Sequence, residues 1–179
     1  MTTWITADLH FGHENILKFS KRRRSLYSDV QEMNNSMASE WNYLVQPEDT
    51  VYVLGDVSYR DGGSCIPIIK NLKGKKILIA GNHDFKMLQR DDFVDCFESV
   101  HNYLEIEHND TKVILFHYPI AEWNGMYWGS VHFFGHIHGK PSGLEEYRAR
   151  DVGFDATGVV VWNLDDAVSD ALTGKKKTN

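Results

Sequence analysis

The sequence has only two cysteines, no apolar run of membrane-spanning length and no excess of positive charge. Cys65 and Cys96 lie far apart without CxxC spacing, which favours reduced thiols over a disulfide framework. The start, Met1-Thr2-Thr3-Trp4, lacks the basic and apolar stretches of a signal peptide, so we expect a cytoplasmic protein with no membrane partner. A formal net charge of −6 argues against a general affinity for nucleic-acid backbone. A phosphate substrate stays open, because bound metal ions can reverse the local charge of a site.

The length and composition are those of a globular domain. The chain has 179 residues, of which 42% are hydrophobic and 25% are charged, so it can bury a core without disulfides or a structural metal. We predict a single domain over residues 1–174, followed by a basic, solvated tail over residues 175–179. Nine histidines are more than a chain of this size usually carries, and their placement is informative.

Short apolar runs bounded by turn residues predict strands at 3–6, 50–54, 76–80, 112–116, 131–134 and 159–162. Residues 104–108 and 112–116 flank Asn109-Asp110 and predict a hairpin. A helix is predicted after Asp29, where Met33, Met37, Trp41 and Leu44 form an apolar stripe, and two more are predicted over residues 66–72 and 165–172. The order indicates a layered α/β protein with one mixed sheet or two sheets.

Polar residues follow five of these strands directly. The five blocks are Asp8-x-His10, Gly55-Asp56, Gly81-Asn82-His83-Asp84, His117 and Gly135-His136-x-His138. Each block alone is weak evidence, because strand ends often carry turn residues and a lone histidine is often part of a core. Ligand sites in open α/β sheets lie beyond the carboxyl ends of strands. Together the blocks therefore indicate one site built from distant parts of the chain.

The ordered set of DxH, GD, GNHD, H and GHxH resembles the calcineurin-like metallophosphoesterases. The stretches Asp8–Ile16 and Val53–Ser58 resemble a compact bacterial and phage-type subgroup of that family. The resemblance implies an α/β (α+β) fold in which a sandwich of two β-sheets is flanked by helices (αββα). It also implies two divalent metal ions, one held by Asp8, His10, Asp56 and His138, and one held by the bridging Asp56 with Asn82, His117 and His136.

These donors fit the chemistry of a catalytic metal pair. Carboxylate, imidazole and amide ligands without thiolate suit Mn²⁺, Fe or Zn²⁺ rather than a closed structural zinc site. We expect Mn²⁺ to be the bound metal, with Fe, Zn²⁺ or Ni²⁺ as alternatives. His83 resembles the family's catalytic histidine, which would protonate the leaving oxygen or stabilise the charge that develops there. Asp84 is expected to help catalysis by orienting His83 or a ligand. A role as a turn residue explains an aspartate at this position equally well.

The implied reaction is direct attack on phosphorus by a hydroxide held between the two metals. Val57-Ser58-Tyr59-Arg60 and GNHD differ from the GDxVDRG and GNHE motifs of protein phosphatases, which argues against that substrate class. We expect a small phosphorylated substrate, preferably a nucleotide-type or cyclic-nucleotide phosphodiester. A phosphomonoesterase, a nuclease and a metal-binding scaffold without catalysis remain alternatives, and the oligomeric state stays open.

Three further residues are candidates for substrate binding. His13 follows the first motif, Arg22 lies in the basic run of residues 21–24, and Arg60 follows the second motif. A helix start is the alternative for His13, and a solvated face is the alternative for the basic run. The aromatics of residues 123–128 could stack a nucleobase, but a core role or a dimer surface explains them as well.

Overall fold

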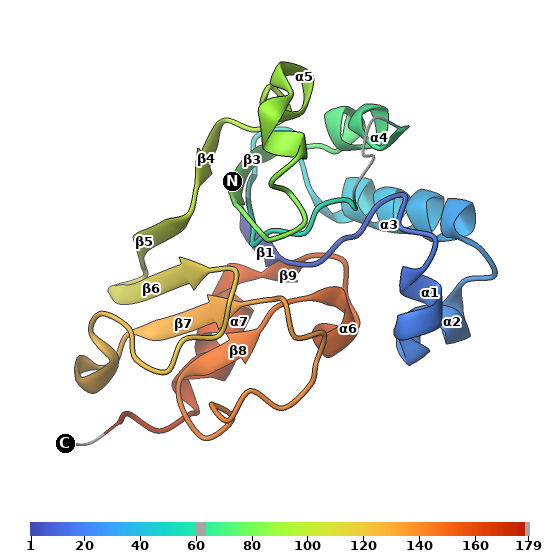
Figure 1. Cartoon of the computed structure of the whole chain (residues 1–179). Helices are drawn as coiled ribbons and strands as arrows, with labels where there is room; N and C mark the ends of the chain where they lie inside the picture. The colour runs from blue at the N-terminus through green and yellow to red at the C-terminus, as the bar shows by residue number, and fades with distance from the viewer. Residues whose placement is uncertain (60–63, 178–179) are drawn as a thin grey trace.

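The strands are arranged in two sheets that pack face to face (Figure 1). A computed structural model describes residues 1–59 and 64–177. The first sheet has the strand order β4-β3-β2-β1-β9, formed by β1 (Thr3–Thr6), β2 (Thr50–Val53), β3 (Lys75–Ile79), β4 (Ser99–His101) and β9 (Trp162–Asn163). Strands β1 to β4 are parallel, and only β9 is antiparallel to its neighbour β1.

The second sheet has the strand order β5-β6-β7-β8, formed by β5 (Tyr103–His108), β6 (Thr111–Phe116), β7 (Val131–Phe134) and β8 (Ala149–Asp151). The expected hairpin joins β5 to β6. Its turn residues Asn109 and Asp110 have φ angles of 48° and 59°, as a tight two-residue hairpin turn requires. Strands β6, β7 and β8 are parallel, so the chain leaves β6 and β7 at the same edge of the sheet.

The core between the sheets follows from alternating side chains. Ile5 of β1 and Ile79 of β3 pack in one buried cluster with Val113 and Leu115 of β6 and Phe133 of β7. Helix α7 (Leu164–Leu172) adds apolar residues to the same cluster. The expected two-sheet sandwich is therefore confirmed, and it directs the ends of β1, β2, β3, β6 and β7 toward one site.

Helices cover the outer face of the first sheet (Figure 1). In α3 (Val30–Leu44), Met33, Met37 and Trp41 are fully buried, and Asp29 caps the helix by accepting from the Glu32 amide at 2.8 Å, as predicted. The shorter elements are α1 (Ile16–Phe19), α2 (Lys21–Leu26), α4 (Ile66–Asn71), η2 (Met87–Gln89), α5 (Asp91–Val94), η3 (Met126–Trp128) and α6 (Phe154–Thr157). Trp123 and Met126 bury the outer face of the second sheet, so they belong to the core, whereas Trp128 is exposed.

The sequence prediction of the strands differs from the structure in two places. Residues 159–162 do not form a strand: Val160 and Val161 are buried in a bent segment after α6, and only Trp162–Asn163 pairs with β1. Strands β4 and β8, of three residues each, were not predicted because such short segments carry little pattern. The described part of the basic tail keeps Lys175 and Lys176 exposed, and the Lys175 amide donates to the Glu146 carbonyl at 2.7 Å.

Within the described residues, the helices are all too short or too polar to cross a membrane.

Candidate metal centre

The five sequence blocks meet at one edge of the sandwich. Asp8 and His10 follow β1, Asp56 follows β2, Asn82 follows β3, His117 follows β6, and His136 and His138 follow β7. Two groups of side chains each bring one ligand atom per residue within 4.8 Å of one another: Asp8, His10 and His138 in the first group, and Asp56, His117 and His136 in the second group. Six of the seven residues expected as ligands thus lie in two clusters.

Asp56 lies between the two groups. Its Oδ2 is 3.9 Å from Nε2 of His10 in the first group, and its Oδ1 is 3.6 Å from Nε2 of His117 in the second group. Asn82 joins the second group, because its Oδ1 lies 3.0 Å from Nε2 of His117. The two oxygens of one buried carboxylate thus face different ligand sets, which is the geometry of a bridging ligand.

Hydrogen bonds on the far side of two rings fix their tautomers. His117 Nδ1 donates to the Leu54 carbonyl at 2.7 Å, and His138 Nδ1 donates to Oδ2 of Asp155 at 2.7 Å. Each ring then presents the lone pair of Nε2 to the site, as metal-binding histidines do. Nε2 of His117 and Oδ1 of Asn82 are then two acceptors in contact, and a shared cation would remove their repulsion.

Two buried atoms in the first group have no hydrogen-bond partner among the described residues. They are Oδ1 of Asp8 and Nε2 of His10, and the two residues are 0% and 1% exposed. Buried polar atoms in proteins are nearly always paired, so such atoms call for an explanation. A divalent cation coordinated by both atoms would provide it, and the residues present therefore fit the metals that the sequence motifs imply.

The electrostatics of the centre agree with this fit. Burial, with the nearby charges of Asp56 and Asp151, raises the pKa of Asp8 well above its usual value. Burial, followed by the charge of Arg23, lowers the pKa of His10 far below its usual value, and burial also lowers the pKa values of His117 and His136. Crowded carboxylates beside neutral imidazoles form a site that a divalent cation stabilises.

The backbone is strained where it presents these ligands. Of the seven non-glycine residues with positive φ in the described part of the chain, five are candidate ligands: Asp8, His10, Asp56, His136 and His138, with φ between 52° and 70°. Such conformations are uncommon for residues with a Cβ and cluster at functional sites. The strain therefore marks the same loops that the motifs identify.

Two motif glycines are needed because the ligand loops approach each other closely. A Cβ on Gly81 would lie 2.5 Å from the Asp56 amide nitrogen, and a Cβ on Gly135 would lie 2.6 Å from Oδ2 of Asp8. Neither contact can be relieved without moving a candidate ligand. The GN and GH pairs in the sequence therefore reflect the packing of one loop on another.

Asp84 occupies a supporting position. It is 0% exposed, and its carboxylate accepts from the backbone amides of Asp56, Val57 and Gly81 at 2.9, 3.0 and 2.9 Å. Burial, partly offset by these amides, raises the pKa of Asp84 to about 7. Within the described chain, no hydrogen bond joins Asp84 to the side chain of His83. Asp84 thus ties the loop after β2 to the loop after β3, which corresponds to the indirect role considered from the sequence.

His83 borders the centre without joining either group of ligand atoms. Its Nε2 lies 3.8 Å from Oδ2 of Asp56, and 34% of its side chain is exposed, compared with 2% for Asp56. Tyr59 packs its ring against His83 at 4.8 Å and stacks on His13 at 4.1 Å. His13, which is 7% exposed, therefore lies in the wall beside His83. Burial is the main cause that lowers the pKa of His13 to about 4.

Arg23 and Asp155 contact residues of the candidate centre, and the sequence did not reveal either of them. From the sequence, the basic run of residues 21–24 could contact substrate or form a solvated face, yet Arg23 is 0% exposed and its guanidinium donates to the carbonyls of Asp8 and Leu9. Asp155 pairs with Arg23 and accepts from His138. These contacts outweigh the effect of burial and lower the pKa of Asp155 to about 2. Arg22 lines the adjoining cavity, and Arg60 lies outside the described residues.

The fold and the site define a class: an α/β sandwich with residues placed for a dinuclear metal centre. The family model for calcineurin-like phosphoesterases matches residues 1–140, so the chain belongs to this family. The family acts by metal-dependent hydrolysis of phosphate esters with two metal ions. The recognition made from the sequence motifs is therefore confirmed.

Several proteins are similar along most of their length. An uncharacterised protein of Methanocaldococcus jannaschii is 32% identical over 146 residues, covering 80% of this chain and 72% of the relative. The gene 66 protein of Mycobacterium phage L5 is 31% identical over 189 residues, covering 89% of each chain. A structure of a protein of unknown function from Aquifex aeolicus has a TM-score of 0.72 at 24% identity, covering 92% of this chain and 96% of that one, and supports the fold.

Proposed function

We propose that this chain is a dinuclear metal-dependent phosphodiesterase for nucleotide-type esters. The observation that carries the proposal is the position of Asp56, whose two carboxylate oxygens face separate sets of ligand atoms. The proposed ligands are Asp8, His10, Asp56 and His138 for one cation, and Asp56, Asn82, His117 and His136 for the other. When bound, such cations supply an activated water and offset the negative charge that develops on the phosphate.

The protein's own groups complete the site. His83 is proposed as the proton donor to the leaving oxygen, because it borders the centre, is partly exposed and is not needed as a ligand. Asp84 holds the loops that present Asp56 and His83, and Asp155 holds the ring of His138. These hydrogen bonds of Asp84 and Asp155 keep the proposed ligands in place before substrate binds.

The arginines near the centre favour a diester over a monoester. Arg23 is occupied by two backbone carbonyls and by Asp155, and Nε of Arg22 donates to the Asp155 carbonyl at 3.2 Å. Neither is therefore placed as a clamp on a terminal phosphate. A phosphodiester carries one negative charge and needs less neutralisation than a doubly charged phosphomonoester. A phosphomonoesterase is the second candidate function.

We further propose Mn²⁺ as the native metal, because the donor set is carboxylate, imidazole and amide without thiolate. Fe, Zn²⁺ and Ni²⁺ are the competing assignments. A cytoplasmic location is proposed from the reduced thiols of Cys65 and Cys96.

The direct test compares bis(p-nitrophenyl) phosphate with p-nitrophenyl phosphate. The purified protein is loaded separately with Mn²⁺, Fe²⁺, Zn²⁺ and Ni²⁺, its metal content is measured, and kcat/KM is determined for both substrates. We expect turnover of both, with the higher kcat/KM for the diester and the highest rate with Mn²⁺. The reverse preference would identify a phosphomonoesterase. No turnover at full loading with any of the four metals would identify a binding scaffold.

A further inference from the structure

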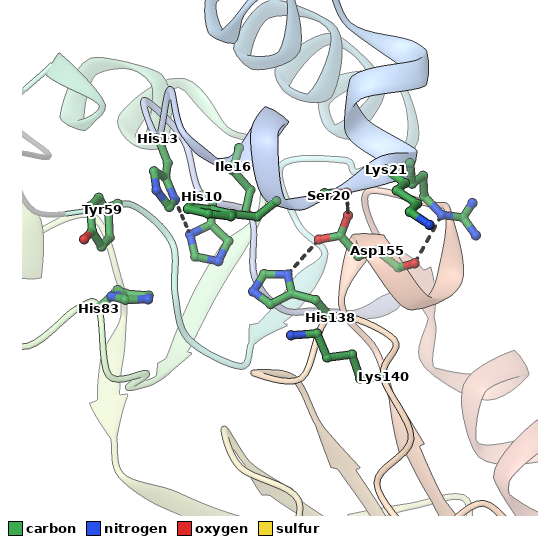
Figure 2. A pocket seen from close by; sticks show the side chains of 12 residues that line it. His10, His13, Ile16, Ser20, Lys21, Tyr59, His83, His138, Lys140 and Asp155 are labelled. Atoms are coloured by element: carbon green, nitrogen blue, oxygen red, sulfur yellow. Dashed lines mark hydrogen bonds and ion pairs between the residues drawn. The ribbon is translucent and has the colours of Figure 1, made fainter.

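A cavity of about 690 Å³ opens beside the candidate metal centre. His10, His83 and His138 line it, residues of α1 and the start of α2 also line it, and Lys140 lies beside His138 (Figure 2). The volume lies within the range of pockets that hold small organic ligands. It is therefore larger than a phosphate group alone requires.

The position of His83 indicates which part of the substrate lies in this cavity. Hydrolysis adds water across the P–O bond, so the leaving oxygen must take up a proton as the bond breaks. If His83 supplies that proton, as proposed above, the leaving oxygen lies next to His83. Because His83 lines the cavity, the group attached to the leaving oxygen extends into it.

Apolar and aromatic side chains line parts of the cavity. Ile16 is buried at 3% exposure, whereas Phe19 exposes 76% of its surface at the cavity rim. The Tyr59 ring, stacked on His13, lines the cavity on the side of His83. Flat apolar surfaces of this kind bind the faces of aromatic rings, including nucleobases.

The cavity also carries an excess of positive charge in a protein of net charge −6. Lys21, Arg22 and Lys140 line it, and its carboxylate, Asp155, is already paired with Arg23 and His138. In the described part of the chain, no ion pair includes Lys21 or Lys140. Exposed cations without a carboxylate partner around a concave surface attract an anionic group.

We propose that this cavity binds a leaving nucleotide that carries a second phosphate, with Phe19 stacking the base and Lys140 and Lys21 binding the second phosphate. This inference rests on the proposed phosphodiesterase function and adds the identity of the leaving group. It makes Phe19, Lys21 and Lys140 the residues that determine specificity. The substrate class is then a dinucleotide or the end of an oligonucleotide.

The test uses three thymidine dinucleotides joined by one phosphodiester: one without a terminal phosphate, one with a 5′-phosphate and one with a 3′-phosphate. A leaving nucleoside with a 3′ oxygen keeps the 5′-phosphate, and one with a 5′ oxygen keeps the 3′-phosphate. We expect one of the two phosphorylated forms to exceed the unphosphorylated form about tenfold in kcat/KM, the size of one or two charge-assisted contacts. The favoured form reports the polarity of cleavage.

Two variants connect that preference to the cavity. Lys140→Ala should remove most of the tenfold ratio, and Phe19→Ser should raise KM for all three dinucleotides. The ratio within one variant is the readout, because it cancels any general effect of Lys140 on the nearby histidines. Lys18→Ala is the matched control, since Lys18 is an exposed lysine of α1 outside the cavity lining. It should keep the ratio of the unmodified enzyme.

The outcomes separate this inference from the function on which it rests. Turnover of bis(p-nitrophenyl) phosphate with equal kcat/KM for the three dinucleotides, or with none of them cleaved, would overturn the inference and leave the phosphodiesterase standing. A tenfold preference that survives both Lys140→Ala and Lys21→Ala would also overturn it. Absence of turnover with bis(p-nitrophenyl) phosphate would overturn the proposed function itself.

Discussion

Nε of Arg23 lies 3.2 Å from both carboxylate oxygens of Asp155, in an ion pair that is buried beneath the candidate metal centre. Each partner also contacts the centre: Arg23 donates to the carbonyl of Asp8, and Asp155 accepts from Nδ1 of His138. One pair thus fixes the backbone that presents one candidate ligand and the ring of another. Because the ion pair is buried away from water, removing one partner leaves the other charge unpaired. The change should therefore lower both the stability of the fold and the affinity for metal.

Asp155→Asn tests this coupling with a side chain of nearly the same size. The change leaves the buried Arg23 charge unpaired and weakens the hydrogen bond that orients His138. We expect the free energy of unfolding to fall by about 3–5 kcal/mol and the metal affinity to fall about 10–100-fold. Urea unfolding and metal titration measure the two effects.

The chain offers a matched control for that change. Asp165 also accepts from a histidine, His108, at 2.6 Å, but it lies on the surface with 62% of its side chain exposed. Asp165→Asn should therefore change stability by less than about 1 kcal/mol and leave metal affinity unaltered. Equal losses of metal affinity in the two variants would show that Asp155 has no special connection to the centre.

Asp56→Asn tests the bridging position. The substitution removes the negative charge that both candidate ligand sets share, so we expect most activity to disappear and the metal content to fall below two ions per chain. Elemental analysis after dialysis, together with turnover of bis(p-nitrophenyl) phosphate, gives both quantities. An active Asp56→Asn enzyme that still binds two metals would refute the assignment, and Asp166→Asn on α7 controls for loss of charge alone.

His83→Ala should separate catalysis from metal binding. Because His83 is proposed as a proton donor and not as a ligand, we expect two metals to be retained while kcat falls by about 10²–10⁴-fold on a dinucleotide. The loss should be much smaller for a p-nitrophenyl ester, whose leaving oxygen needs little protonation. Equal losses on both substrates would argue for a structural role, and loss of metal would make His83 a ligand.

The clustering of the candidate ligands could be predicted from the sequence because these residues follow directly from strand ends. Strands 3–6 and 50–54 can be recognised from their apolar runs, and parallel neighbours place the residues after them, Asp8 and Asp56, at a common edge. His136 follows a strand of the second sheet, so only the order of the motifs connected it to that edge before the structure was known. The glycines beside them are part of the same signal, since close loop contacts exclude a Cβ at Gly81 and Gly135.

The residues around the centre could not be predicted in this way. Arg23 stands in a run of four basic residues, and nothing local distinguishes it from its exposed neighbours. Asp155 lies 132 positions further along, so their pairing depends on how α2 and α6 pack. Val160 and Val161 have the pattern of a strand but are buried in a bend, because burial by tertiary packing satisfies apolar residues without a sheet.

His132 should make the protein less stable in acid. It is fully buried, its Nδ1 donates to the Ile114 carbonyl at 3.2 Å, and burial is the main cause that lowers its pKa to about 4. The folded protein therefore keeps the ring neutral, whereas the unfolded chain takes up a proton below about pH 6.5, so stability is lost as the pH falls from about 6.5 to 4. His132→Phe removes this linkage, and its unfolding free energy relative to the unmodified protein should rise by about 2 kcal/mol between pH 7 and pH 5. Urea unfolding of both proteins at the two pH values and one metal concentration measures the change, and a constant difference would mean that His132 takes up protons equally in both states.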